Sequence, residues 1–196
     1  MAILREFHLQ ADRTSRKIGD MRVCRRHVLT GLGAALVAPA PALAALGDVR
    51  TIAFDNMHTG EKLKRDYWAD GRYLPDALAE VNRVLRDFRS GEVHPIAPGL
   101  IDLLALLHAR LETVQPFRVI SGFRSSATNA LLRGENSHSG VAVKSLNMRG
   151  MAIDINVAGR PLAGLRRMAL SLRGGGVGYY PQSDFVHVDV GRVRSW

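Results

Sequence analysis

Hydrophobic positions recur at helical spacing in three segments of the chain, residues 74–88, 98–111 and 162–172. In the first and third segments an apolar residue returns every three or four positions, which is typical of a helix with one buried face. The second segment leaves little polar face, which is typical of a helix in the centre of a core. Pro75 and Pro98 fall in first turns, where proline is well tolerated because its missing N–H has no helical partner. The pattern predicts three helices.

Shorter apolar segments predict β-strands. Residues 151–157 and 185–190 alternate between apolar and polar positions, the period of two that a half-buried strand shows. Residues 117–121 and 177–180 are brief apolar segments, and residues 50–73 mix aromatic residues with turn formers, which predicts a hairpin. Together these elements predict an α+β fold in which helices pack on one face of a small antiparallel sheet.

The first 44 residues have the organisation of an export signal. Arg25 and Arg26 precede a segment of small and apolar residues, 31–38, and residues 42–44 read Ala-Leu-Ala, a small-x-small pattern that suits a signal peptidase. Cleavage after this pattern leaves residues 45–196 as one mature domain. The signal is of the twin-arginine type, so its predicted partners are the twin-arginine export machinery and a signal peptidase.

The apolar segment of this leader is too short to be a membrane span. It holds about a dozen apolar residues and is interrupted by Pro39 and Pro41, whereas a span needs about 20. We therefore predict a protein of the periplasm or cell envelope that is not an integral membrane protein after cleavage. Residues 1–20 carry no pattern and Met21 begins a leader of normal length, so starts at Met1 and at Met21 both fit the sequence.

Charge says little about the partner of the mature domain. The formal net charge is +9, but residues 1–44 hold 7 basic and 3 acidic residues, and the rest of the chain holds 20 basic against 15 acidic. A modestly basic domain attracts anionic partners in general. The sequence has no basic run with interleaved aromatics, the pattern of nucleic-acid binding, so we expect no nucleic-acid partner. The one cysteine, Cys24, lies in the leader, so the mature domain forms no disulfide.

Two of the predicted strands carry ionisable residues opposite their aliphatic rows. Asp154 lies on the first strand, and His187 and Asp189 lie on the second. If these strands are neighbours, a carboxylate and an imidazole meet on one face of the sheet. Two interpretations stay open, a hydrogen-bonded polar patch on a solvent-facing sheet and a metal site.

Three short blocks carry a family resemblance. They read SGFRS at residues 121–125, SLNMRGMAID at 145–154 and FVHVD at 185–189. These blocks resemble the motifs of the murein endopeptidase K-like family, which is related to D-Ala-D-Ala carboxypeptidases, phage endolysins and the hedgehog fold. The resemblance extends from about Arg50 to Trp196. It implies a hedgehog-like or D-Ala-D-Ala peptidase-like fold and a zinc-dependent endopeptidase that hydrolyses stem or cross-link peptides of peptidoglycan in cell wall turnover.

The expected zinc ligands of that family are His, Asp and His, with water in the fourth position. Asp154 matches the aspartate and His187 the second histidine, whereas Asn147 stands where the first histidine is expected. An amide oxygen is a weaker donor to zinc than imidazole. Three interpretations follow: Asn147 ligates weakly, His138 in the preceding loop replaces it, or zinc is lost. Loss of zinc favours the alternative function, a catalytically impaired peptidoglycan-binding or regulatory protein of the same fold.

The resemblance also implies catalytic and substrate-binding residues. The general base is expected at Asp184, three residues before the second histidine; Asp189 is the competing candidate, or it orients that histidine. Arg124 matches an arginine that faces the substrate carboxylate or the developing oxyanion. Ser121 and Asn129 are expected to shape the same wall of the substrate site.

Overall fold

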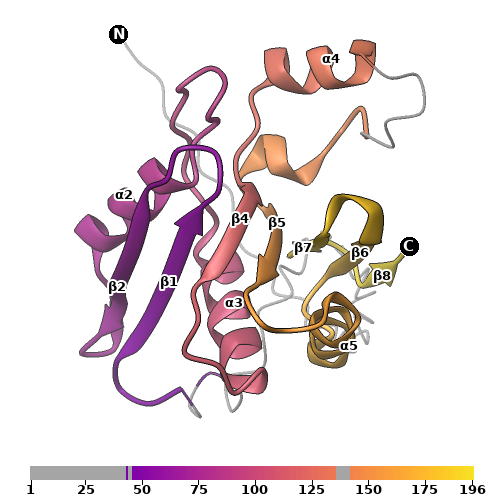
Figure 1. Cartoon of the computed structure of the whole chain (residues 1–196). Helices are drawn as coiled ribbons and strands as arrows, with labels where there is room; N and C mark the ends of the chain where they lie inside the picture. Colours follow the sequence, from indigo (N-terminus) through magenta and orange to yellow (C-terminus); the bar gives the residue numbers. More distant parts are fainter. Residues whose placement is uncertain (1–42, 44–45, 136–141) are drawn as a thin grey trace, which may run out of the picture. The chain divides into compact units, whose positions relative to one another are not determined.

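The structure, a computed structural model, describes residue 43 and residues 46–135 and 142–196 (Figure 1). The predicted leader lies outside these residues apart from residue 43, so the export signal and its cleavage site stay predictions. None of the helices in the described part of the chain has the length and apolar character needed to cross a bilayer.

Eight strands of the described chain form one sheet in the order β3-β2-β1-β4-β5-β7-β6-β8. Their bounds are β1 Arg50–Asn56, β2 Lys62–Ala69, β3 Arg72–Tyr73, β4 Phe117–Ser121, β5 Ala152–Val157, β6 Gly176–Tyr180, β7 Phe185–Asp189 and β8 Arg194–Ser195. The predicted hairpin is present as β1 and β2, extended by β3. Most neighbours are antiparallel, as predicted, but β1–β4 and β6–β8 run parallel. Parallel pairing of β1 and β4 is possible because a long helical crossover joins them.

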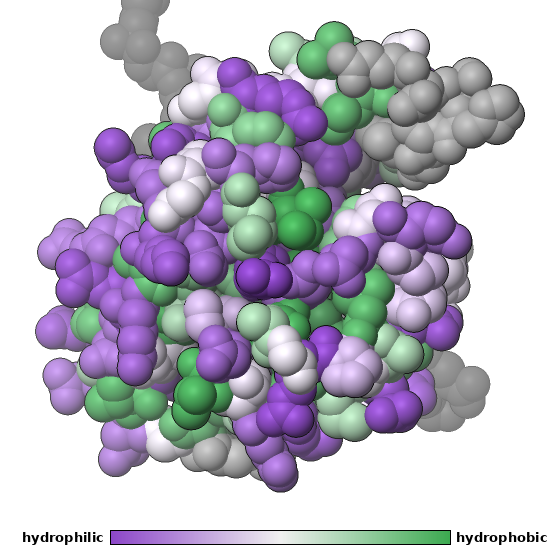
Figure 2. All heavy atoms as spheres, viewed as in Figure 1, coloured by the Kyte–Doolittle hydropathy of each residue, from purple (hydrophilic) through white to green (hydrophobic). Residues whose placement is uncertain are grey.

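Three of the described helices bury the apolar face of this sheet. The bounds of the described helices are α2 Pro75–Val84, α3 Pro98–Arg110, α4 Ser126–Glu135 and α5 Leu162–Leu172, and two 3₁₀ turns are η1 Leu146–Arg149 and η2 Pro181–Ser183. The predicted helices are α2, α3 and α5, which share one core with the sheet. In α3, Leu100, Ile101 and Leu104 are fully buried, as predicted for a central helix. The face seen in Figure 2 is mostly hydrophilic, with apolar residues scattered among polar ones. The predicted α+β class is confirmed.

The register of the central strands assembles a polar group on the opposite face. Ile153 and Ile155 of β5 are buried in the core, so the alternate residue, Asp154, points away from the helices. Asp154 pairs with Ser121 of β4 on one side and with His187 of β7 on the other. Partners in register on neighbouring antiparallel strands lie about 5 Å apart. Three adjacent strands therefore bring these side chains together.

A buried carboxylate ties the hairpin to the core. Asp102 in α3 is 4% exposed and accepts hydrogen bonds from the hydroxyls of Tyr67 at 2.9 Å and Tyr73 at 2.6 Å. The guanidinium of Arg50 lies 3.0 Å from the same carboxylate. Burial, together with the hydrogen bond to Asp102, raises the pKa of Tyr73 to about 12. These contacts fix β1–β3 against α3.

Candidate active site

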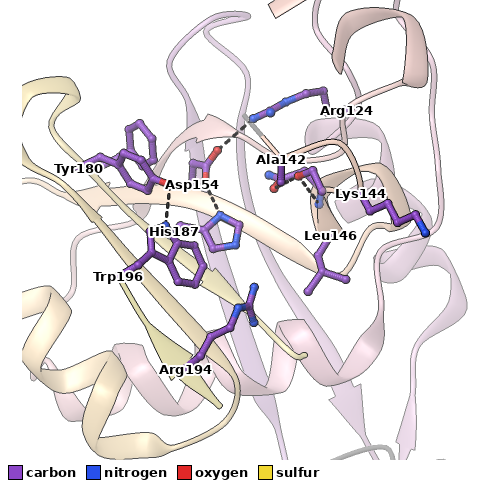
Figure 3. A pocket seen from close by; sticks show the side chains of 12 residues that line it. Arg124, Ala142, Lys144, Leu146, Asp154, Tyr180, His187, Arg194 and Trp196 are labelled. Carbon is purple, nitrogen blue, oxygen red and sulfur yellow. Dashed lines mark hydrogen bonds and ion pairs between the residues drawn. The ribbon is translucent and has the colours of Figure 1, made fainter. Parts of the chain in front are cut away.

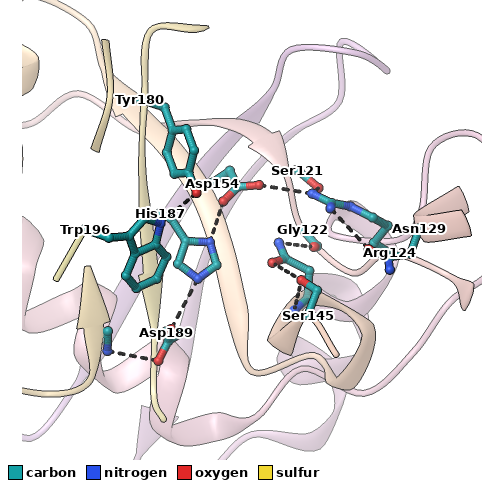
Figure 4. A network of polar contacts seen from close by, with 12 residues as sticks. Ser121, Gly122, Arg124, Asn129, Ser145, Asp154, Tyr180, His187, Asp189 and Trp196 are labelled. Carbon is teal, nitrogen blue, oxygen red and sulfur yellow. Dashed lines mark hydrogen bonds and ion pairs between the residues drawn. The ribbon is translucent and has the colours of Figure 1, made fainter. Parts of the chain in front are cut away.

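A chain of hydrogen bonds links three of the predicted residues, Asp154, His187 and Asp189 (Figure 4). His187 Nδ1 lies 2.7 Å from Asp154 Oδ1, and His187 Nε2 lies 3.2 Å from Asp189 Oδ2. Asp189 is only two residues along the same strand, yet its carboxylate reaches the ring. Both ring nitrogens of His187 therefore face carboxylates, and Asp189 is placed to orient the imidazole.

Asp189 is itself held from several sides. It is fully buried, and the backbone N–H groups of Gly176 and Gly191 donate to Oδ1 at 2.9 and 2.8 Å. Arg194 donates to both carboxylate oxygens, at 3.2 and 2.8 Å. A side chain at Gly176 would collide with this carboxylate, so the sequence needs glycine there. The Asp189 carboxylate is thus a fixed anion beneath His187, closed off from solvent.

The carboxylates control the charge state of His187. Burial alone would lower the pKa of His187, but the hydrogen bonds to Asp154 and Asp189 outweigh it and raise the pKa to about 9. Burial alone would raise the pKa of Asp189, but the hydrogen bonds from His187 and Arg194 hold that pKa well below its usual range. In this geometry His187 is an imidazolium near neutral pH, paired with the ionised carboxylate of Asp189.

Arg124 completes the polar group from the side of β4. Its Nη2 lies 3.3 Å from Asp154 Oδ2 and 3.3 Å from Ser121 Oγ, and its Nη1 lies 3.5 Å from Asn129 Oδ1. The Arg124 side chain is 12% exposed. The predicted substrate-binding residues Ser121, Arg124 and Asn129 therefore do come together, and they do so beside the predicted ligand Asp154.

A segment after α2 holds the Arg124 loop. The N–H of Phe123 donates to the carbonyl oxygen of Leu85 at 2.8 Å, and the N–H of Ser125 donates to Asp87 Oδ2 at 2.9 Å. A Cβ at Gly122 would lie 2.5 Å from the same Leu85 oxygen, so only glycine permits this approach. These contacts flank Arg124 on both sides and fix the direction of its side chain.

Both polar atoms of the Asn147 side chain are hydrogen-bonded. It lies in η1, is 1% exposed, and donates from Nδ2 to the carbonyl oxygen of Gly122 at 3.1 Å. Its Oδ1 accepts from Ser145 Oγ at 3.1 Å. The backbone carbonyl of Asn147 accepts from the N–H of Arg124 at 3.2 Å. Asn147 thus joins η1 to the Arg124 loop as a structural link, with its amide oxygen already engaged.

The donor set does not fit a His-Asp-His zinc site. It contains one carboxylate, Asp154, one imidazole, His187, and the engaged amide of Asn147. His187 Nδ1 and Asp154 Oδ1 lie 2.7 Å apart and are two of the donors that such a site needs, but among the described residues the place of the second imidazole is taken by the Asn147 amide. In the described part of the chain, no group of three or more His, Cys, Asp or Glu side chains is arranged to hold a metal ion. His138, the alternative ligand, lies outside the described residues.

Asp184 lies at the edge of this arrangement. It is exposed, has a left-handed backbone with φ +51°, and follows η2. Its carbonyl oxygen and Oδ2 accept hydrogen bonds from Asn156 Nδ2 at 2.8 and 2.9 Å. Asn156 follows Asp154 by two residues on the same face of β5. Asp184 therefore contacts the neighbour of Asp154 on that face. The structure does not place Asp184 in the lining of the pocket that holds His187.

The polar group opens into a pocket of about 310 Å³ (Figure 3). The lining includes Arg124, Asn147, Asp154 and His187, and it adds residues beyond the predicted site residues. These are Ala142, Lys144, Ser145, Leu146, Tyr180, Phe185, Arg194 and Trp196. Several of them lie in or beside the three motif blocks, and that position is the sequence feature by which they could have been identified.

The described domain has helices on one face of its sheet, and a carboxylate, an imidazole and a guanidinium meet in a pocket on the other. This is the α+β arrangement expected for the peptidase-like class that the three motif blocks resemble. A family model described as peptidoglycan L,D-endopeptidase MepK matches residues 44–196. The chain belongs to this family.

Curated relatives agree with the family match. The peptidoglycan L,D-endopeptidase MepK of Escherichia coli strain K12 is 45% identical over 168 residues, which cover 84% of this chain and 90% of the relative. The protein of the same name from Shigella flexneri has the same identity and coverage. A probable peptidoglycan L,D-endopeptidase MepK of Haemophilus influenzae is 40% identical over 154 residues, which cover 75% of this chain and 78% of that relative. The predicted family is confirmed.

Proposed function

We propose that this protein is a peptidoglycan endopeptidase of the periplasm or cell envelope that hydrolyses peptide bonds in stem or cross-link peptides during wall turnover. The observation that carries the proposal is the convergence of Arg124, Asp154 and His187 in one pocket. The names of the family and of its relatives support the reaction, and they make L,D bonds the first linkage to test.

The charge of the pocket suits this substrate. Among the described residues its lining contains Arg124, Lys144, Arg194 and the protonated His187, against the carboxylate of Asp154 in the lining and that of Asp189, which pairs with Arg194 and His187. Stem peptides of peptidoglycan carry free carboxylates, and a pocket with excess positive charge attracts and orients such groups. Arg124 can donate to a substrate carboxylate or to the oxygen of a scissile carbonyl, since its guanidinium offers several donors in one plane.

The two candidates for general base differ in their exposure to solvent. Asp184 is exposed and can meet water, whereas Asp189 is fully buried and bound to His187, Arg194 and two backbone N–H groups. We therefore assign proton transfer to Asp184 and the orientation of His187 to Asp189.

A second candidate function is favoured by Asn147. With an asparagine in place of the first histidine, the same pocket can bind peptidoglycan peptides without cleaving them, in a binding or regulatory protein. Zinc binding by this chain requires a third ligand from elsewhere, and His138 is the residue to test.

One set of variants separates the two functions. Purified mature protein is incubated with cross-linked muropeptides with and without added zinc, beside Asn147→His, His138→Ala and His187→Ala. Cleavage by the native protein that His187→Ala abolishes establishes the endopeptidase, and its loss in His138→Ala assigns the third ligand. Binding without cleavage, together with zinc uptake and cleavage gained by Asn147→His, establishes the binding protein. Muropeptides that neither bind nor react would contradict both functions.

Export is proposed on the sequence of the leader. The family match begins at residue 44, next to the predicted cleavage site, which supports a division into residues 1–44 and 45–196. Replacing Arg25 and Arg26 by lysine should retain the precursor in the cytoplasm, as cell fractionation measures. Normal periplasmic processing of that variant would contradict a twin-arginine signal.

A further inference from the structure

One wall of the pocket is aromatic. It consists of Tyr180 at the end of β6, Phe185 at the start of β7 and Trp196 after β8, and we call these three residues the aromatic wall. In Figure 3, Tyr180 and Trp196 lie on one side of Asp154 and His187, and Arg124 and Lys144 lie on the other. The Trp196 ring centroid is 5.3 Å from that of His187. The aromatic wall therefore lies beside His187.

Trp196 is fixed by contacts on its edge, its face and its backbone. Its Nε1–H donates to the hydroxyl of Tyr180 at 2.7 Å, and the Tyr180 ring is stacked on Phe185 with centroids 4.6 Å apart. The guanidinium of Arg194, itself bound to Asp189, lies 4.7 Å from the indole centroid. The Trp196 backbone pairs with β6, since its N–H donates to Val177 and its carbonyl oxygen accepts from Tyr179.

A glycine at position 178 leaves room for the Trp196 indole. A Cβ at position 178 would lie 2.7 Å from the Trp196 ring and 2.8 Å from the Tyr180 ring, so Gly178 is required for the indole to occupy its place. Trp196 nevertheless stays 46% exposed. A large side chain that is held from several sides and still open to solvent is preorganised for a ligand, because little side-chain entropy is lost on binding.

We propose that Trp196 is a specificity-determining residue, whose indole packs on the aliphatic part of a carboxylate-bearing side chain next to the scissile bond. This inference rests on the proposed function and names the part of the peptide that the aromatic wall binds. An aromatic face buries methylene groups well. The cations of the same pocket, Arg124 and Lys144, lie across from the wall and bind the carboxylate. Aromatic anchors of this kind dominate binding energy at interfaces.

The chain offers a direct reporter because it contains two tryptophans, Trp68 and Trp196. Trp68 lies in β2, packed edge-on against Tyr73, outside the pocket. In Trp68→Phe, Trp196 is the one tryptophan, and titration with a purified disaccharide tetrapeptide containing meso-diaminopimelate should change its emission saturably. In the matched variant Trp196→Phe, Trp68 is the one tryptophan, and its emission should stay constant under the same titration.

Affinity measured by calorimetry completes the test. Trp196→Ala should raise Kd for the tetrapeptide about tenfold, the effect of losing a moderate aromatic anchor. Tyr180→Phe keeps the ring but removes the acceptor of the indole N–H, so it should raise Kd about threefold and lower the emission anisotropy of Trp196 in the absence of ligand.

The outcomes separate this inference from the proposed function. Calorimetric binding with unchanged Trp196 emission in Trp68→Phe overturns the role of Trp196 and leaves the function standing. Absence of any calorimetric binding by the native protein overturns both. The fluorescence titration of Trp68→Phe leaves Trp196 in place. It therefore tests the inference even if Trp196→Ala does not fold.

Discussion

Replacing Asp189 with asparagine tests whether this buried carboxylate holds the site together. In the native protein Oδ1 accepts from Gly176, Gly191 and Arg194, and Oδ2 accepts from Arg194 and His187. An asparagine keeps the shape but presents one NH₂ group that cannot accept. Either two backbone N–H groups and one N–H group of Arg194, or His187 and the other N–H group of Arg194, then lose their acceptor.

The expected loss of stability is large for so small a change. A hydrogen bond to a charged group contributes about 1.5–3 kcal/mol, and breaking a buried ion pair costs about 3–5 kcal/mol. We expect Asp189→Asn to lower the free energy of unfolding by about 4 kcal/mol. For a domain of this size the melting temperature should fall by roughly 10 °C.

Urea unfolding followed by circular dichroism measures this difference. Asp184→Asn is the matched control, because Asp184 is exposed and asparagine tolerates its left-handed backbone. The control should change stability by less than about 0.5 kcal/mol, and as the proposed base it should lower kcat. The reasoning is refuted if Asp189→Asn unfolds like the native protein while cleavage disappears, because Asp189 would then act in the reaction rather than in the scaffold.

Other predictions follow from single contacts. Burial alone would raise the pKa of Asp87, but hydrogen bonds from Thr128 and Ser125 hold that pKa well below its usual range. The ionised carboxylate therefore stabilises the fold above the unfolded pKa of about 4, and this stabilisation is lost as the pH falls below that value. Asp87→Asn should make the melting temperature depend less on pH in the acid range, and parallel pH profiles of variant and native protein would contradict this. Asp102→Ala should lower the free energy of unfolding by about 3 kcal/mol in urea, since Tyr67 and Arg50 lose their acceptor; a native midpoint would argue against that network. Lys144→Ala should raise Kd for a carboxylate-bearing muropeptide about threefold at low salt and less at high salt, and a salt-independent effect would exclude an electrostatic role.

The sequence predicted the bounds of several helices and strands to within one residue. The bounds of α5 and β4 are the predicted ones, and α3 differs by one residue at its end. α2 ends at Val84, before Leu85 and Phe88, although the apolar spacing continues. The chain turns there because the segment around Asp87 binds the Arg124 loop, a tertiary contact that local periodicity does not encode.

The sequence named residues that the structure brings together, and their role as a site stays a prediction; it did not predict the contacts between them. Alternation placed Asp154 and His187 on polar strand faces, and the family-like blocks singled out Arg124, Ser121 and Asn129. The Asp189–Arg194 pair and the place of Trp196 depend on backbone turns near Gly176 and Gly191, and no local pattern indicates where such turns direct a side chain.

By itself, the sequence determined the α+β class, the family and the residues available for chemistry, because periodicity and motif spacing are local properties of the chain. Only the tertiary structure decided which of these residues meet. Strand order places β5 between β4 and β7, and that order alone brings Asp154 within hydrogen-bonding distance of both Arg124 and His187. The fold also engages Asn147 with Ser145 and Gly122 and leaves Asp184 at the rim, because the strands and turns that carry these residues are held by contacts distant in sequence.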